Sequence, residues 1–328
     1  MDAPIWNPIY PHGTFAGTLE IRPDLTRLAN GPVLYSVCIE GHEYLVKEIP
    51  FNDDKDKFDA TVVMKVDKLR ALDHENTTKY FGLVIRQQEG NRNWINYRIS
   101  SRYYSGGNLK QWVQQAAKAR PLIKQCLPHA TIRQFLRDLL TGLDCIHSNF
   151  DIIHCDIKPQ NLVLRHTGYQ RLVIVDFEGA IFQEESQDRL ENVDFTALYA
   201  APEVSLRCAE LAVGLEHPAK ISHKSDIWSV GCVALQMYTG YSPVIQQWEK
   251  SPESMADDWD GSYRKICYTE PEAIMFQLMF QQARPLVSSN MDPLLKDFVK
   301  LCLQFNMDSR RTAAELLRDL NGYLYLSN

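Results

Sequence analysis

The stretch "IIHCDIKPQNLVL", near the middle of the chain, carries four polar side chains at close spacing: His154, Asp156, Lys158 and Asn161. A carboxylate can accept the proton of an attacking hydroxyl, and an ammonium group can neutralise charge on a phosphoryl group during its transfer. A second motif, "VDFEGA", adds Asp176 a short distance further on. The oxygens of Asn161 and Asp176 are hard ligands of the kind that Mg²⁺ prefers. The two motifs together predict a site for metal-assisted phosphoryl transfer.

The composition indicates a folded globular protein in two parts. A chain of 328 residues exceeds the roughly 250 to 300 residues at which a single hydrophobic core stops growing, so two lobes are expected. Hydrophobic residues at 45% and charged residues at 23% match ordinary globular usage. A net charge of -6 argues against a nucleic-acid partner, which requires a basic face. An anionic ligand would have to be met by local cations.

The cysteines and the start of the chain say where such a protein would work. The eight cysteines are scattered without a C-x-x-C pair, so neither a zinc knuckle nor a disulfide framework is predicted. The opening "MDAPIWNPIY" lacks a basic run followed by an apolar stretch, and no segment is apolar over the length of a bilayer. We expect a cytoplasmic or nuclear protein without a membrane span.

The elements that must position the motifs begin with a small sheet. Residues 1–22 are rich in Pro and Gly and are expected to form an irregular leader. The run "VLYSVCIEGHEYLVKEI" predicts a hairpin that turns at Glu40-Gly41, and "KYFGLVI" and "NWINYRIS" predict two further strands. Between them, apolar residues recur at helical spacing: Val62, Val66, Leu69 and Leu72. This part predicts a sheet with one helix.

The glycine pair in "YSGGNLKQWV" marks the boundary between the two lobes, and the rest of the chain has mainly helical periodicity. The helical segments include "TIRQFLRDLLTGLDCIHS", "SDIWSVGCVALQMYTG", "DPLLKDFVKLCLQF" and "TAAELLRDL". We therefore predict an α+β fold with a leader over residues 1–22, a nucleotide-binding lobe over residues 23–104 and a catalytic lobe over residues 105–328.

The order of these features resembles the eukaryotic protein kinase superfamily. A strand lysine, a helix, the glycine break, H-x-D-x-K-x-x-N, D-F, A-P-E, S-D-I-W and a late arginine follow one another from about Asp24 to Leu320. The resemblance implies a bilobal kinase-like fold, with a small lobe of sheet plus helix and a larger, mostly helical lobe. It also implies ATP and Mg²⁺ as cofactors and a protein substrate.

The resemblance assigns roles to individual residues. Asp156 and Lys158 would be catalytic, and Asn161 and Asp176 would bind Mg²⁺ and nucleotide. The remaining nucleotide-binding positions would be Gly31, Val33, Leu45, Lys47, Ser101 and Tyr103. With a lysine two residues after the catalytic aspartate, the motif resembles that of Ser/Thr kinases rather than that of Tyr kinases.

Several framework roles follow from the same resemblance. The hydroxyl of Thr196, close before "APE", could bridge Asp156 and Lys158. Glu203 would form an ion pair with Arg310. Asp226 of "SDIW" would anchor the backbone of the catalytic loop.

The chain departs from the kinase pattern at several positions. The phosphate-covering loop retains only Gly31, Leu45 replaces a small residue over the adenine, and Cys155 replaces an arginine. Lys65 stands where the helix glutamate is expected, and Glu178 replaces the glycine after D-F. Without the arginine, activation by loop phosphorylation is not expected. Glu178 could reach a metal, form a relocated ion pair with Lys65, or face solvent.

Two functions remain open from these residues. The first is a divergent, active Ser/Thr protein kinase, because Lys47, Asp156, Asn161 and Asp176 are all present. The alternative is a pseudokinase, a scaffold or allosteric partner with weak or no catalysis. A small-molecule phosphotransferase shares the metal chemistry but gives no reason for "TALYAAPE". The region 244–290 matches no kinase motif and is predicted to be a docking surface for a partner.

Overall fold

The computed structural model divides into two compact units, Met1–Ser105 and Gly106–Asn328, and each is described by itself. The described residues are 19–20, 33–39, 42–52, 68–87, 94–119, 125–165, 171–177, 179–182, 195–215, 218–243, 246–247, 266–267, 271–280, 284–288 and 290–324. Most of the predicted leader and of the predicted docking region lies outside these residues, as do Gly31, Lys65 and Glu178.

The first unit contains a five-stranded sheet in the order β1-β2-β3-β5-β4, with every neighbouring pair antiparallel. Its strands are β1 (Leu19–Glu20), β2 (Val33–Ile39), β3 (His42–Asn52), β4 (Tyr80–Gln87) and β5 (Trp94–Arg102). Ile39 pairs with His42, so the predicted hairpin between β2 and β3 is confirmed.

The end of the predicted leader is a correction. Leu19–Glu20 forms a strand against Ser36 and Val37 of β2 rather than an irregular segment. The exposed edge of β2 offers unpaired backbone groups, and even a two-residue segment without a periodic pattern can pair with them.

The predicted helix of the first unit is described only at its end. Residues 68–70 are helical, and Leu69 and Leu72 are fully buried, as the apolar spacing predicts. The Nζ of Lys79 donates to the carbonyls of Arg70 at 2.8 Å and Leu72 at 3.4 Å, satisfying carbonyls that a helix end leaves without partners. Because Lys79 directly precedes β4, these bonds hold the start of β4 beside the end of the helix.

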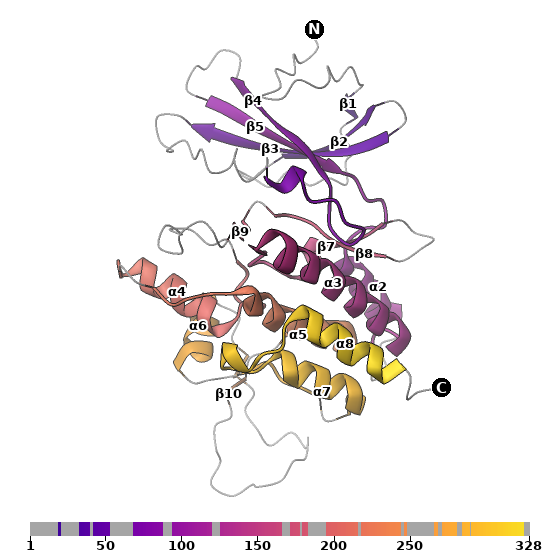
Figure 1. Cartoon of the computed structure of the whole chain (residues 1–328), viewed down its shortest axis with the longest axis vertical. Coiled ribbons are helices and arrows are strands. Elements are labelled where there is room, and N and C mark those ends of the chain that lie inside the picture. The colour runs from indigo at the N-terminus through magenta and orange to yellow at the C-terminus, as the bar shows by residue number, and fades with distance from the viewer. Residues whose placement is uncertain are drawn as a thin grey trace, which may run out of the picture. The chain divides into compact units, whose positions relative to one another are not determined.

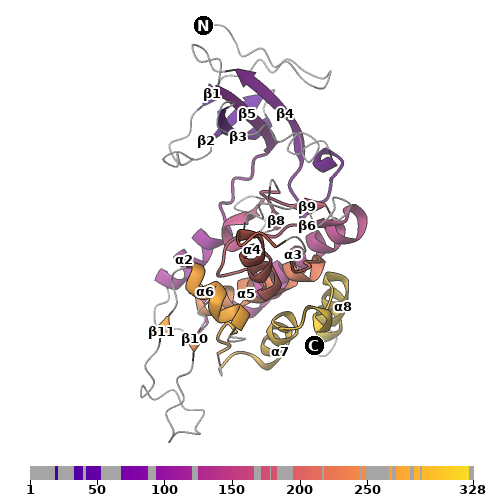
Figure 2. The ribbon, with the colours of Figure 1, turned by 90° about the vertical axis from the view of Figure 1, so that its left-hand side faces the viewer.

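The second unit is mainly helical (Figure 1). Its helices are α2 (Leu109–Ala119), α3 (His129–Phe150), α4 (Pro202–Ala212), α5 (His223–Thr239), α6 (Pro271–Phe280), α7 (Pro293–Cys302) and α8 (Ala313–Leu324). Helix α5 is buried along its length from Ser225 to Tyr238 and packs against α3 and α7, while α8 lies along α3. Helix α6 lies against α4 (Figure 2). Helix α5 is thus the centre of this unit.

Local sequence explains why α5 begins and ends where it does. Ser222 and Ser225 form a reciprocal capping box at the N-terminus, and Gly240 closes the helix at φ 81°. Gly231 lies against α7, where an added Cβ would come within 2.8 Å of the Cβ of Cys302. The small residue allows the close helix contact at the core.

Short strands and single turns carry the motif residues. Strand β6 (Ile152–Ile153) pairs with β9 (Ile181–Phe182), and β7 (Leu162–Leu164) pairs with β8 (Leu172–Ile174). Two 3-10 turns, η1 (Pro159–Asn161) and η3 (Met307–Ser309), precede β7 and α8. In the predicted docking region, β10 (Gln246–Gln247) pairs with β11 (Ile266–Cys267). The loop between β6 and β7 contains the opening motif.

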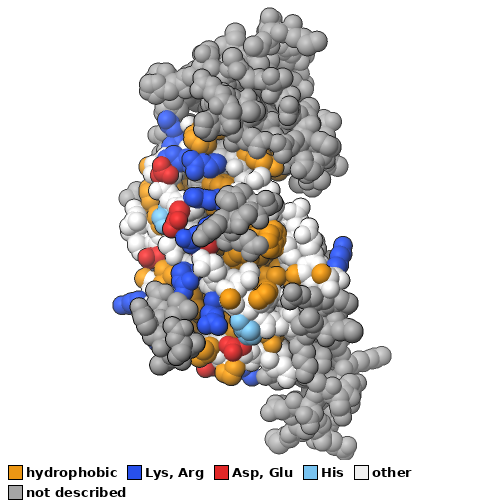
Figure 3. Space-filling view, turned by 90° about the vertical axis from the view of Figure 1, so that its right-hand side faces the viewer, with side chains coloured by type: hydrophobic (Ala, Val, Ile, Leu, Met, Phe, Trp, Pro, Cys, Tyr) orange, Lys and Arg blue, Asp and Glu red, His pale blue; other side chains and the backbone are white. Residues whose placement is uncertain are grey.

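The α+β fold class is confirmed by the sheet of the first unit and the helices of the second. On the face drawn in Figure 3, apolar side chains lie among Lys, Arg, Asp and Glu side chains on the described surface. Among the described residues, no helix combines the length and the apolar character needed to cross a bilayer.

Candidate active site

Three side chains surround the carboxylate of Asp156. The hydroxyl of Thr196 donates to Oδ1 at 2.8 Å, and the Nζ of Lys158 lies 2.6 Å from Oδ2. Lys158 also donates to the hydroxyl of Thr196 at 2.8 Å. The predicted bridge by Thr196 is confirmed. Because its two oxygens are held from different sides, the carboxylate has a fixed orientation at a half-buried position.

Asn161 lies on the other side of Asp156. Its Nδ2 donates to the backbone carbonyl of Asp156 at 2.9 Å and to the Oδ2 at 3.0 Å. These bonds orient the amide so that its oxygen points away from Asp156. The side chain is buried, and η1 presents it at the start of β7. An amide oxygen held in this way can serve as a metal ligand.

The backbone brings Asp176 next to Asn161. The N–H of Val175 donates to the carbonyl of Asn161 at 3.0 Å, continuing the pairing of β7 with β8. Asp176 itself has a φ of 70°, in the left-handed region that non-glycine residues seldom occupy. Such strain is stored where surrounding contacts fix the backbone, often at functional sites.

The donor set of Asn161 and Asp176 fits Mg²⁺. Both side chains offer hard oxygens, and Mg²⁺ is usually held by one or two carboxylates together with waters and substrate phosphates. No cluster of three or more His, Cys, Asp or Glu side chains that could hold a metal occurs in the described part of the chain. Asn161 and Asp176 would leave the other coordination positions of Mg²⁺ to water and substrate phosphates.

Asp226 of α5 anchors the catalytic loop from below. Its buried carboxylate accepts the backbone N–H groups of His154 and Cys155, both at 2.9 Å, and lies 2.9 Å from the Nε2 of His147. Burial alone would raise the pKa of Asp226, but the hydrogen bond with His147 and the N–H of His154 hold that pKa below its ordinary value. The predicted anchoring role is confirmed.

His154 joins the loop to the Asp176 segment. Its Nε2 donates to the carbonyl of Val175 at 3.0 Å, and its Nδ1 accepts the N–H of Asp156 at 3.3 Å, so one neutral tautomer satisfies both bonds. The ring also packs edge-on against Phe177, with centroids 4.8 Å apart. Displacement of the Asp176 segment would therefore be felt at Asp156.

Cys155, which stands where kinases commonly have arginine, is accommodated inside the protein. The cysteine is buried, has a φ of 66°, and directs its thiol to the carbonyl of Ile153 at 3.7 Å. A left-handed conformation costs roughly 1 to 2 kcal/mol for a non-glycine residue, and here the bond to Asp226 holds it. The spacing of the motif gave no sign of this conformation.

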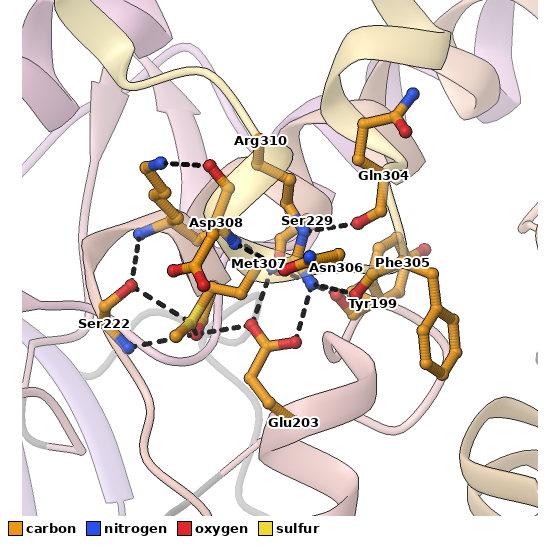
Figure 4. Close-up of polar contacts among 12 residues, drawn as sticks. Tyr199, Glu203, Ser222, Ser229, Gln304, Phe305, Asn306, Met307, Asp308 and Arg310 are labelled. Atoms are coloured by element: carbon orange, nitrogen blue, oxygen red, sulfur yellow. Dashed lines mark hydrogen bonds and ion pairs between the residues drawn. The ribbon is translucent and has the colours of Figure 1, made fainter.

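The predicted ion pair between Glu203 and Arg310 is confirmed (Figure 4). The guanidinium binds both carboxylate oxygens at 2.6 Å and donates further to the carbonyls of Gln304 and Lys224. Arg310 is fully buried, and Ser225 donates a third hydrogen bond to Glu203 at 2.7 Å. The pair ties the start of α4 to the segment before α8.

The predicted nucleotide residues of the first unit lie on its sheet. Leu45 and Lys47 share one face of β3, because they are two residues apart, and Ser101 pairs directly with Leu45. Val33 pairs with Glu48 at the start of β2, and Tyr103 follows β5. Gly31 lies outside the described residues. The sheet thus gathers Leu45, Lys47 and Ser101.

Comparison with known proteins decides what this constellation is. The family model for the protein kinase domain matches residues 31–320. The chain belongs to the protein kinase family. Its fold is accordingly the α+β kinase fold that the order of motifs predicted.

Individual kinases are similar over much of the chain. Mitogen-activated protein kinase kinase kinase 2 of Arabidopsis thaliana is 25% identical over 316 residues, which are 92% of this chain and 41% of that protein. Mitogen-activated protein kinase kinase 2 of the same plant is 28% identical over 225 residues, 68% of this chain and 52% of that protein. The chain therefore spans about half or less of the length of these relatives.

The kinase site includes a feature that the motifs did not predict. The ring of His147 stacks on that of His223, with centroids 4.7 Å apart and planes at 21°. The Nε2 of His223 lies 3.0 Å from a carboxylate oxygen of Asp151. Two histidines more than seventy positions apart give no local signal, although His223 lies two residues before "SDIW" and His147 seven residues before His154.

Proposed function

We propose that this kinase domain transfers the γ-phosphoryl group of ATP to Ser or Thr hydroxyls of protein substrates. The observation that carries the proposal is the carboxylate of Asp156, which Thr196 and Lys158 hold at 2.8 and 2.6 Å. In this role Asp156 orients the incoming hydroxyl and accepts its proton. Lys158, already beside the carboxylate, neutralises charge on the phosphoryl group in transit.

The proposed cofactors are ATP and Mg²⁺. Asn161 and Asp176 would hold the metal, which supplies neutralisation of the phosphate charge when bound. Lys47 would meet the α- and β-phosphates, and Leu45 and Ser101, on the same sheet face, would line the place of the base. Gly31, Val33 and Tyr103 are proposed to complete the nucleotide site.

The pseudokinase alternative rests on residues that lie outside the described part of the chain. Lys65 replaces a glutamate, Glu178 replaces a glycine, and Gly31 alone remains of the phosphate loop. These changes affect positioning, whereas the proposed base and metal ligands are all retained. Loss of a positioning group lowers a rate, while loss of the base or a metal ligand removes most of it.

The deciding experiment is an ATP titration of the purified protein with and without Mg²⁺, beside an Asp176→Asn variant. Active or not, a nucleotide-binding kinase domain should bind ATP more tightly with Mg²⁺, and the variant should lose that gain. Phosphate transfer from labelled ATP to a Ser/Thr peptide library then separates the two functions. Binding without transfer would establish the pseudokinase, and no Mg²⁺-dependent binding would contradict the proposed cofactors.

A further inference from the structure

A buried carboxylate on α3 lies away from the kinase motifs. Asp138 has 1% of its surface exposed. Its Oδ1 accepts the Nε2 of Gln134 at 2.8 Å and the Nη1 of Arg171 at 2.7 Å. Its Oδ2 accepts the backbone N–H of Leu172 at 3.0 Å. A buried charge is costly unless it is paired and hydrogen-bonded. Asp138 meets this condition, and an apolar residue at the same position could not accept the three hydrogen bonds.

The bond to Leu172 fixes the beginning of strand β8. The same strand is fixed at its other end, where Val175 donates to the carbonyl of Asn161 and accepts from His154. Asp176 follows directly, in its strained left-handed conformation. Because β8 is bonded at both ends, it cannot slide along its own axis, and the backbone position of Asp176 is fixed with it.

The same clamp reaches Asn161 through β7. Leu162 pairs with Ile174 and Leu164 with Leu172, and the N–H of Arg165 donates to the carbonyl of Arg171 at 3.0 Å. Asp138 binds the first residue of β8, and Asp176 follows shortly after the end of that strand. The paired strand β7 begins directly after Asn161. A shift at Leu172 would displace both proposed metal ligands.

Arg171 supplies the charge that this carboxylate requires. Its side chain is 39% exposed, against 1% for that of Asp138. The guanidinium can thus stay partly hydrated while neutralising the buried group, which limits the desolvation cost of the pair. The pair joins the surface of the β7–β8 hairpin to α3.

We infer that Asp138 and Arg171 are positioning residues, which hold the β7–β8 hairpin on α3 so that Asn161 and Asp176 are placed to bind Mg²⁺. The inference rests on the proposed function for the metal. It concerns no direct contact with substrate: the two residues act through β8 on Asp176 and through the β7–β8 pairing on Asn161. Outer partners of metal ligands commonly set metal affinity in this indirect way.

The first measurement uses the protein without nucleotide. Amide hydrogen exchange of residues 171–177 should accelerate in Asp138→Ala and Arg171→Ala, because the clamp on Leu172 is lost or loosened. Arg171→Lys keeps a cation near the carboxylate and should recover most of the protection. The matched control is Tyr238→Phe, which removes a hydrogen bond to the carbonyl of Asn290 in the same unit without touching the hairpin.

The second measurement is the Mg²⁺ concentration that half-saturates the tightening of ATP binding. In Asp138→Ala it should rise at least about tenfold, while ATP binding in EDTA stays within about twofold of the wild type, since Asp138 does not contact nucleotide. Tyr238→Phe should leave both values unchanged. If Asp138→Ala does not fold, Arg171→Ala carries the test at the half-exposed partner.

Two results would overturn the inference. One is exchange of residues 171–177 equal to the wild type in folded Asp138→Ala or Arg171→Ala. The other is a Mg²⁺ dependence that shifts no more than in Tyr238→Phe. A wild-type protein that shows no Mg²⁺-dependent ATP binding would contradict the proposed function, and the exchange measurement would still decide whether the pair holds the hairpin.

Discussion

At the scale of single residues, the neighbours of Asp156 fix the orientation of its carboxylate. Thr196 binds the Oδ1 of Asp156 at 2.8 Å, and Lys158 and Asn161 both bind its Oδ2, at 2.6 and 3.0 Å. A group fixed in this way costs little reorganisation when a hydroxyl arrives. In the proposed function, this carboxylate would accept the proton of the hydroxyl with a cation beside it.

Asp156→Asn should therefore reduce phosphate transfer by at least about a hundredfold. The amide preserves the shape and most hydrogen bonds but cannot accept the proton. ATP affinity should change little, because the proposed role of Asp156 concerns the nucleophile. Labelled-phosphate transfer and ATP titration measure the two effects.

The control is Asp144→Asn, since Asp144 lies on α3 and contacts only Ser148 among the described polar partners. It should leave transfer unchanged. Equal activity of Asp156→Asn and the wild type would mean that the assayed transfer arises from another protein or another site.

The stacked histidines predict how stability depends on pH. Burial, and next the charge of His147, lower the pKa of His223, although Asp151 and Asp226 act in the opposite direction. The unfolded chain then takes up a proton at a higher pH than the folded protein does, so the free energy of unfolding falls as the pH drops below about 6.5. Asp226, whose pKa is lowered, adds its loss only at far more acidic pH.

Melting temperatures between about pH 8 and about pH 5 test this window. The wild type should lose stability on acidification, and His223→Gln should lose less, because its side chain takes up no proton. A His223→Gln variant with the same pH dependence as the wild type would assign the titration to other groups.

At the scale of elements, the pair of Glu203 and Arg310 holds together segments that are distant in sequence. Arg310 also receives support from the ring of Trp228 on α5, with its Cζ 5.3 Å from the ring centroid. The start of α4, the core helix α5 and the segment before α8 meet at this single guanidinium. Its removal would leave Glu203 in a largely buried position with no cation.

Arg310→Ala should lower the free energy of unfolding by about 3 to 5 kcal/mol, the usual cost of breaking a buried pair. Denaturant unfolding measures it. Lys300→Ala serves as the control, because Lys300 forms an exposed pair with Asp297 at 3.4 Å, worth at most about 0.5 kcal/mol. Equal stabilities of the two variants would show that the buried pair contributes nothing.

How far the elements follow from sequence depends on the range of the signal. The periodicity of α3, α5, α7 and α8 is local and predicted these helices, whereas the neighbours of Asp156, including the distant Thr196, were predicted from the resemblance to kinases. Strand β1 was missed because two residues carry no period. The bonds of Asp138 and the stack of His147 on His223 were missed because they join positions that only the folded chain brings together.

At the scale of the whole molecule, the residues proposed for nucleotide binding, metal binding and phosphate transfer are distributed over the two compact units. Lys47 belongs to the sheet unit, and Asp156, Asn161 and Asp176 belong to the helical unit. Lys65 and Glu178 are divided in the same way. Double-mutant cycles measure directly whether residues of the two units act on the same nucleotide.

The relocated pair of Lys65 and Glu178 is one such case. If the two form an ion pair, Lys65→Ala and Glu178→Ala should each weaken ATP binding, and the double variant should be no weaker than the worse single one. An exposed ion pair is worth only about 0 to 1 kcal/mol. Strictly additive effects on melting and ATP affinity would indicate that both side chains face solvent.

The cycle on Lys47 and Asp176 tests the assembly of the nucleotide site itself. Lys47→Ala and Asp176→Asn should each weaken binding of Mg·ATP, because Lys47 is proposed to bind the phosphates and Asp176 the Mg²⁺. Their effects should couple by at least about 0.5 kcal/mol, since independent and distant sites add within that margin. Lys300→Ala, combined with either variant, should add without coupling. Additive effects of Lys47→Ala and Asp176→Asn would mean that the sheet lysine and the metal ligand do not meet on one nucleotide.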